Sequence, residues 1–131
     1  MTRPTIAVVG ASSDRAKFGN KAVRAYVLKG YDVYPIHPKE ERIEGLQVYR
    51  SVADVPAETL DRVSIYLSPT IGLQALPEIA RKPAGEVWFN PGADSPEVLA
   101  KARELGMNAI AGCSIVDVGV SPYELDNPPP S

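Results

Sequence analysis

The fold is decided by residues 6–13, which read IAVVGASS. Four apolar residues, three of them β-branched, end at a glycine, and this pattern is typical of a short strand buried on both faces of a parallel sheet. From about Gly19 the apolar residues recur at helical spacing, and Gly30 stands where a helix commonly ends in a left-handed conformation. The first 30 residues therefore predict a strand, a loop and a helix.

The same alternation continues along the chain. We expect further strands at residues 33–36, 63–67, 86–89 and 108–111. A helix is predicted to start near Ile71 and to kink or restart at Pro77, and another to start at Ser95 and stop at Gly106. Alternating strands and helices imply right-handed crossovers and a parallel sheet covered on both faces. The predicted fold class is a Rossmann-like three-layer α/β/α domain with a five-stranded parallel sheet, order 3-2-1-4-5, in which 63–67 is the third strand.

The remaining segments are predicted to be connections. Residues 39–42 are polar and should form a solvated link, 46–49 should be extended, and 51–54 should make a single turn. We assign residues 1–120 to the domain and 121–131, which are proline-rich, to an extended or flexible tail. The apolar stretch 115–120 suits packing on its own sheet or on a second copy of the chain. A homodimer is therefore one of the two alternatives.

Composition excludes several classes of protein. The 131 residues fit one domain, and 14 basic against 16 acidic residues leave no charge excess that would favour nucleic acid or an anionic membrane. No apolar run approaches the roughly 18 residues of a membrane span. The N-terminus leads directly into a strand, so we expect no signal peptide, and a single cysteine suits a cytoplasmic protein. One cysteine and one histidine also argue against a structural zinc site.

The turn between the first strand and the first helix is the predicted binding site. Ligands of such sheets bind at the carboxyl ends of the strands, where backbone amides and a helix N-terminus can meet a phosphate. Small residues let the ligand approach the main chain, hydroxyls add donors, and a lysine adds a positive charge. The candidate residues of this turn are Gly10, Ala11, Ser12, Ser13, Asp14, Lys17, Phe18, Gly19 and Asn20.

The turn does not match the dinucleotide fingerprint, since Ser12 and Arg15 stand where that pattern has its second and third glycines. The second strand is followed by a basic residue in place of the usual acidic one. A lysine there would suit a phosphate on the adenosine ribose, as in coenzyme A or NADP, and an ordinary solvated lysine is the alternative. The candidates of this segment are Ile36, His37, Pro38 and Lys39.

Two further loops should reach the same crevice. Ser68 and Pro69 follow the strand at 63–67, and Asn90, Pro91 and Gly92 follow the strand at 86–89. Proline keeps both loops stiff, and Asn90 is a candidate partner for a ligand amide or base. Simple turn chemistry is the alternative for both loops.

Taken together, these motifs resemble the small stand-alone CoA-binding domain proteins, which are related in fold to the nucleotide-binding part of succinyl-CoA synthetase. The resemblance extends from about residue 6 to residue 116 and includes a late cysteine, Cys113. It implies that coenzyme A lays its phosphates on residues 10–14 near Lys17 and its adenosine end on 36–39, and that the loop 90–92 lines the crevice. The chain departs from the family in having Asn90 where glutamine is common and Gly112 where arginine often precedes the cysteine.

These observations leave several functions open. The resemblance and the layout favour a non-catalytic coenzyme A or acyl-CoA binding protein that acts as a carrier, sensor or adaptor. The alternative is an NADP-type oxidoreductase or nucleotide sensor. A ligase is disfavoured because the related synthetases phosphorylate a histidine in a further domain, whereas His37 is expected near the adenosine. Cys113 is either a buried structural thiol or a reactive one, and we assign no catalytic residue.

Overall fold

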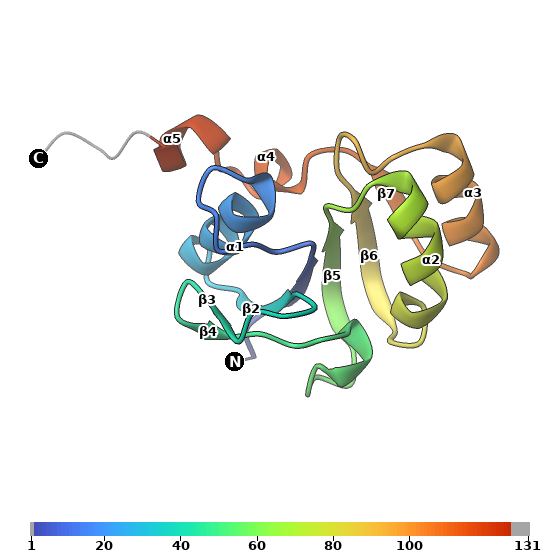
Figure 1. Ribbon diagram of the computed structural model, residues 1–131, viewed down its shortest axis with the longest axis horizontal. Coiled ribbons are helices and arrows are strands. Elements are labelled where there is room, and N and C mark those ends of the chain that lie inside the picture. The colour runs from blue at the N-terminus through green and yellow to red at the C-terminus, as the bar shows by residue number, and fades with distance from the viewer. Residues whose placement is uncertain (1, 127–131) are drawn as a thin grey trace, which may run out of the picture.

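The computed structural model describes residues 2–126, and within them five parallel strands form a twisted central sheet (Figure 1). The strands are β1 (Thr5–Val9), β2 (Asp32–Ile36), β5 (Leu60–Ile65), β6 (Ala84–Phe89) and β7 (Ala109–Ala111). A small antiparallel hairpin of β3 (Arg42–Ile43) and β4 (Leu46–Gln47) lies against β2. The predicted Rossmann-like class with a five-stranded parallel sheet is confirmed.

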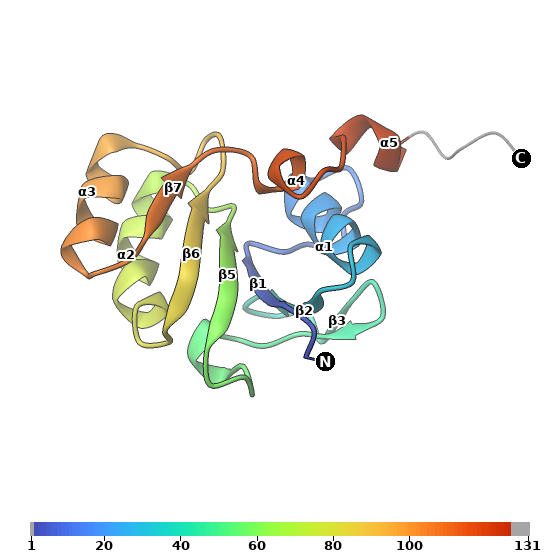
Figure 2. The same cartoon turned by 180° about the vertical axis from the view of Figure 1, so that it is seen from behind.

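The order across the sheet is β2-β1-β5-β6-β7, and Figure 2 shows it from behind. This agrees with the 3-2-1-4-5 pattern when the extended segment ending at Tyr49, which forms a parallel bridge with Ile36 outside β2, takes the place of the third strand. One assignment needs correction, because the strand predicted at 63–67 is β5 and lies next to β1, not beyond β2. Strand order depends on crossovers between distant segments, which local patterns do not encode. The sheet's switch point therefore lies between β1 and β5.

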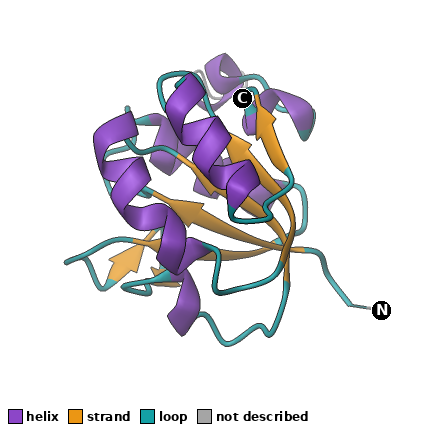
Figure 3. Cartoon of the chain, turned by 90° about the vertical axis from the view of Figure 1, so that its right-hand side faces the viewer, coloured by secondary structure: helices purple, strands orange, loops and turns teal. Residues whose placement is uncertain are grey.

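Helices cover both faces of the sheet. One face carries α1 (Phe18–Leu28), against which the short helices α4 (Ser114–Asp117) and α5 (Pro122–Asp126) pack. The other face carries α2 (Pro69–Ile79) and α3 (Pro96–Glu104), which face the viewer in Figure 3. A single 3-10 turn, η1 (Val52–Asp54), precedes β5 at the predicted position.

The alternating side chains of β1 divide the core into two layers. Ile6 and Val8 pack with the α1 layer, while Ala7 and Val9 pack with the α2 and α3 layer. All four are at most 5% exposed, as predicted for a strand covered on both sides. In the α1 layer, Ile115 and Val120 are buried within the chain's own core.

Several helices begin or end at the residues that the sequence predicts. Gly30 and Gly106 both have positive φ angles just after a helix, where the missing Cβ makes this conformation inexpensive. Ser51 and Ser95 cap their helical segments through the side-chain oxygen.

Three segments of the chain differ from the predictions. Pro77 neither restarts nor ends α2, because it lies in the last turn, where proline removes only one helical bond and Ala80 still bonds to Leu76. Within the polar segment 39–42, Arg42 begins strand β3. The segment predicted as an extended tail begins with helix α5, and its last residues, 127–131, lie outside the described part of the chain.

Candidate functional site

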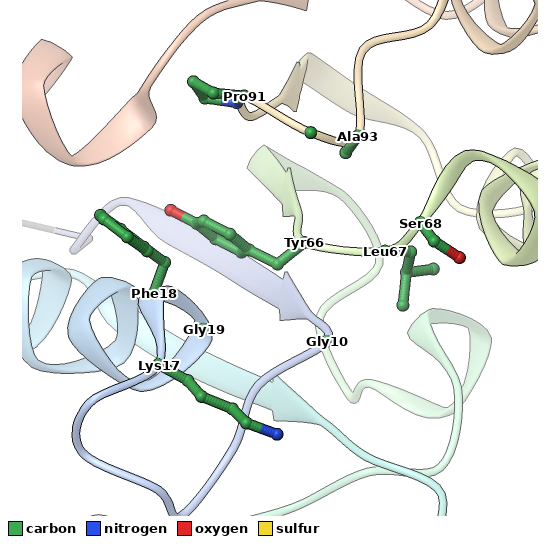
Figure 4. A pocket seen from close by; sticks show the side chains of 10 residues that line it. Gly10, Lys17, Phe18, Gly19, Tyr66, Leu67, Ser68, Pro91 and Ala93 are labelled. Atoms are coloured by element: carbon green, nitrogen blue, oxygen red, sulfur yellow. The ribbon is translucent and has the colours of Figure 1, made fainter.

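Three adjoining hollows form a groove along the carboxyl ends of the central strands. The central hollow has a volume of about 310 Å³ and lies between the N-terminal ends of α1 and α2 (Figure 4). Its lining residues are Gly10, Lys17, Phe18, Gly19, Tyr66, Leu67, Ser68, Pro91, Gly92 and Ala93. Residues from three of the four predicted segments therefore meet here, and the segment after β2 is the exception.

The other two hollows share walls with the central one. The first, of about 280 Å³, shares Gly10 and Leu67 with it and is lined by Ile36, His37, Pro38 and mostly aliphatic side chains. The second, of about 110 Å³, shares Phe18, Tyr66 and Pro91 with it and also includes Asn90 and Cys113. We call these the aliphatic hollow and the narrow hollow.

Two glycines allow the backbones around the central hollow to approach closely. A Cβ on Gly10, which has φ +85°, would lie 2.4 Å from the Tyr66 carbonyl oxygen. A Cβ on Gly19 would lie 2.1 Å from the Gly10 carbonyl oxygen. Both distances are far inside van der Waals contact, so only glycine fits at these two positions and the groove floor is main chain.

The electrostatics of the central hollow favour an anion. Neither α1 nor α2 has an acidic residue in its first turn or a side-chain cap on its N-terminus. No side chain in the first turn of either helix therefore offsets the partial positive charge of these helix ends. Lys17, at the start of α1, makes no ion pair with any described residue, and Ser68 contributes a hydroxyl.

The turn at residues 11–14 is arranged differently from the prediction. Ser12 Oγ accepts a hydrogen bond from the Asp14 amide at 3.0 Å, and the Ser13 amide donates to a Glu40 carboxylate oxygen at 3.1 Å. Ala11, Ser12, Ser13 and Asp14 do not line the three hollows. Side chains and amides of this turn bond within the chain because small polar residues readily satisfy nearby backbone groups.

Asn20 has a structural role in holding this turn. It is fully buried, and its Nδ2 donates to the Ser12 carbonyl at 2.9 Å and to Glu44 at 3.0 Å. Its Oδ1 accepts from Arg24 Nε at 2.7 Å. Asn20 therefore shapes the turn and does not line the groove.

Asn90 belongs to a buried polar network. The residue is 1% exposed, and its Nδ2 donates to Ser64 Oγ at 2.9 Å and to the Ile65 carbonyl at 3.0 Å. Its Oδ1 accepts from the Ser114 amide at 2.9 Å. Because both amide hydrogens are used inside the protein, Asn90 holds the start of α4 against β5 and has no free donor for a ligand.

Tyr66 forms the wall between the central and narrow hollows, next to Phe18 in Figure 4. Its hydroxyl lies 3.4 Å from Ser114 Oγ, at the edge of the same network. Burial is the main cause that raises the pKa of Tyr66 to about 12. The hydroxyl is therefore protonated at neutral pH.

The loop after β2 is held together by Arg50. Its guanidinium donates to the carbonyl oxygens of His37 at 3.1 Å, Lys39 at 3.1 Å and Glu40 at 2.6 Å. His37 Nδ1 accepts from the amides of Lys39 and Glu40 at 3.0 and 2.9 Å, which places its hydrogen on Nε2 in the neutral ring. The side chain of Lys39 is exposed and, unlike Arg50, does not line the aliphatic hollow.

Sequence reasoning missed several lining residues. Tyr66 and Leu67 were not predicted, because the strand was expected to continue to residue 67 whereas β5 ends at Ile65. Arg50 was missed because the loop after β2 was followed only to Lys39. Pro69 was predicted but is the first residue of α2 and does not line the hollows. Within the described residues there is no cluster of three or more potential metal ligands. The same residues contain no helix of the length and apolar character needed to cross a bilayer.

The fold and the groove define a Rossmann-like α/β domain with the groove at the β1/β5 switch point. The chain belongs to the CoA binding domain family, which matches residues 4–119. It is 36% identical over 118 residues to the acetate–CoA ligase [ADP-forming] II alpha subunit of Pyrococcus furiosus. That alignment covers 80% of this chain and 25% of the subunit, so the chain spans about a quarter of the relative's length.

Two solved structures share the fold of this chain. A conserved hypothetical protein from Pyrococcus furiosus is 32% identical with a TM-score of 0.76, and the match covers 88% of this chain and 99% of that one. A dinucleotide-forming acetyl-coenzyme A synthetase from Ca. Korarchaeum cryptofilum is 27% identical with a TM-score of 0.68, covering 81% of this chain and 25% of that one. The family resemblance predicted from the sequence is thus confirmed.

Proposed function

We propose that this chain binds coenzyme A or an acyl-CoA in the groove and acts as a carrier, sensor or adaptor without catalysis of its own. The observation that carries the proposal is the row of three hollows with different linings. Coenzyme A is an elongated ligand with an adenosine, a diphosphate and a pantetheine arm. An aliphatic hollow, a hollow between two helix N-termini and a narrow hollow match these three parts in order.

The central hollow suits the diphosphate. Backbone amides at the starts of α1 and α2, the Ser68 hydroxyl and the Lys17 ammonium group are donors or positive charges that an anion prefers. The bare backbone at Gly10 and Gly19 permits close approach. An uncharged ligand could accept hydrogen bonds here but would leave the Lys17 charge unpaired.

The aliphatic hollow suits an adenine ring. Ile36, Val52 and Ile71 provide apolar walls, and Pro38 stiffens the loop beside them. Arg50 supplies the positive charge at this hollow. In our proposal it takes the role near the ribose phosphate that the sequence assigned to Lys39.

The narrow hollow supports a binding role over catalysis. Its aromatic walls, Phe18 and Tyr66, suit the pantetheine arm, and Cys113 lies at the same end. Because the Tyr66 pKa is raised to about 12, this hydroxyl is a poor general base at neutral pH. The single histidine, His37, lines the aliphatic hollow instead.

The proposal is tested by calorimetry and thermal unfolding with coenzyme A, dephospho-coenzyme A, NAD and NADP side by side. We expect coenzyme A to bind most tightly, and at 100 times its dissociation constant to add about 2.7 kcal/mol to stability. Dephospho-coenzyme A should bind more weakly if the ribose phosphate is recognised. Tighter binding of NADP than of coenzyme A would replace our proposal with the nucleotide alternative.

Replacing Phe18 with alanine tests the position of the site. Phe18 is 51% exposed and lines both the central and narrow hollows, so its removal should cost little stability. We expect affinity for coenzyme A to fall about fivefold to tenfold, since an aromatic contact contributes on the order of 1 kcal/mol. The matched control is Leu28→Ala, at the far end of the same helix and 68% exposed. Equal calorimetric affinities of the two variants would contradict this placement.

A further inference from the structure

A carboxylate of the chain itself sits on the turn that the sequence assigns to phosphate. Glu40, in the loop after β2, accepts a hydrogen bond from the Ser13 backbone amide at 3.1 Å and a second, short one from Ser13 Oγ. The two residues are 27 positions apart in the chain, so the contact joins two separate loops. A backbone amide and a hydroxyl that converge on one anion are the donors that a phosphate oxygen would use.

The groups around Glu40 also face the groove. The positive charge of Lys17, which lines the central hollow, favours the charged form of Glu40. His37 Nε2, at the aliphatic hollow, lies 3.8 Å from the same carboxylate. Hydrogen bonding to Ser13 is the main cause that lowers the pKa of Glu40. The carboxylate is therefore charged at neutral pH, and it lies close to one residue from the lining of each of the two larger hollows, Lys17 and His37.

The rest of the loop is arranged to present Glu40. Arg50 binds the carbonyl oxygens of His37, Lys39 and Glu40, and His37 Nδ1 accepts the amides of Lys39 and Glu40. These bonds fix the backbone of the loop, while the Glu40 side chain makes a separate contact that can break without them. The side chain can thus leave Ser13 while the loop keeps its shape.

We propose that Glu40 is an internal anion that occupies the Ser13 donors in the ligand-free chain and so keeps this turn out of the groove, and that a diphosphate ligand in the groove displaces the carboxylate and takes its place on Ser13. This inference rests on the proposed function, because it concerns regulation of the same groove. Displacement costs the Glu40–Ser13 contact, and the carboxylate also repels the approaching ligand. Glu40 therefore raises the ligand concentration at which the groove fills, and removing its charge should tighten binding.

The test compares Glu40→Gln with Glu41→Gln, a matched control that removes the same charge from the neighbouring exposed residue. Isothermal calorimetry with coenzyme A should show Glu40→Gln binding roughly threefold or more tightly than the wild type, while Glu41→Gln changes little. Glu40→Ala should shift affinity in the same direction, and thermal unfolding checks that all variants are folded. Unchanged or weaker binding by Glu40→Gln overturns the displacement proposal but leaves the proposed function standing.

A second measurement separates this proposal from the identity of the ligand. Inorganic pyrophosphate is titrated into ¹⁵N-labelled wild type and Glu40→Gln while the Ser13 amide signal is followed. Saturable shifts at lower pyrophosphate concentration in the variant support displacement, even if coenzyme A binds to neither protein and the proposed function fails. The same response in both proteins, or no response in either, overturns it.

Discussion

Replacing Gly19 with alanine is expected to lower the free energy of unfolding by about 2–4 kcal/mol. Alanine normally stabilises a helix relative to glycine, and Gly19 is inside α1. Here the new Cβ would lie 2.1 Å from the Gly10 carbonyl oxygen, so α1 must move away from the turn after β1. Denaturant unfolding measures the loss. Because the same movement distorts the central hollow, coenzyme A affinity should fall as well.

The matched control for this prediction is Gly72→Ala. Gly72 is also helical and buried, but its nearest neighbour to a new Cβ is a Val98 methyl group at an ordinary 3.9 Å. We expect this variant to gain about 0.5–1 kcal/mol from helix propensity. Equal stabilisation of both variants would contradict the close contact between α1 and the Gly10 carbonyl. It would also contradict the conclusion that main-chain atoms form the floor of the groove.

Replacing Asn90 with aspartate is expected to cost about 3 kcal/mol at neutral pH. The amide hydrogens that bind Ser64 Oγ and the Ile65 carbonyl would be replaced by carboxylate oxygens in a buried position. Burial and the facing carbonyl would raise the pKa of the new carboxyl above its unfolded value. The loss of stability therefore grows as the pH rises from the unfolded to the folded pKa of the new carboxyl. At lower pH the stability of the variant should approach that of the wild type.

Asn108→Asp is the matched control for this second prediction. Asn108 Nδ2 donates to the Gly85 carbonyl at 3.0 Å in an exposed setting, so its loss should cost under about 1 kcal/mol with little pH dependence. Thermal unfolding of both variants between pH 4 and 8 provides the comparison. A small, pH-independent effect at Asn90 would contradict its place in the buried network.

Much of the fold could be predicted from local signals. The apolar run of β1, the helix stop at Gly30 and the cap at Ser95 depend on neighbours in the chain, and the structure has all three. The place of β5 beside β1 depends on a crossover between distant segments and could not be read from any local pattern. Helix α4 was missed because four residues are too few to show helical periodicity.

The candidate site was predicted in outline and differs in its detail. Gly10, Lys17 and Gly19 line the groove because the strand–turn–helix connection places them there. Ser13 and Asn90 were given ligand roles from their chemistry, yet both bond to residues distant in the chain, Glu40 and Ser114. Tyr66 reaches the groove only because β5 adjoins β1. Partners of this kind become visible once the tertiary structure is known.

The central claim is that a coenzyme A ligand occupies the groove at the carboxyl ends of the strands, and backbone amide shifts during a coenzyme A titration test it most directly. We predict saturable shifts at Gly10, Gly19, Ser68 and Gly92, which line the central hollow. Shifts limited to Gly106 and Met107, beside a separate hollow lined by neither α1 nor the β1 turn, would contradict the account. So would the absence of any saturable shift.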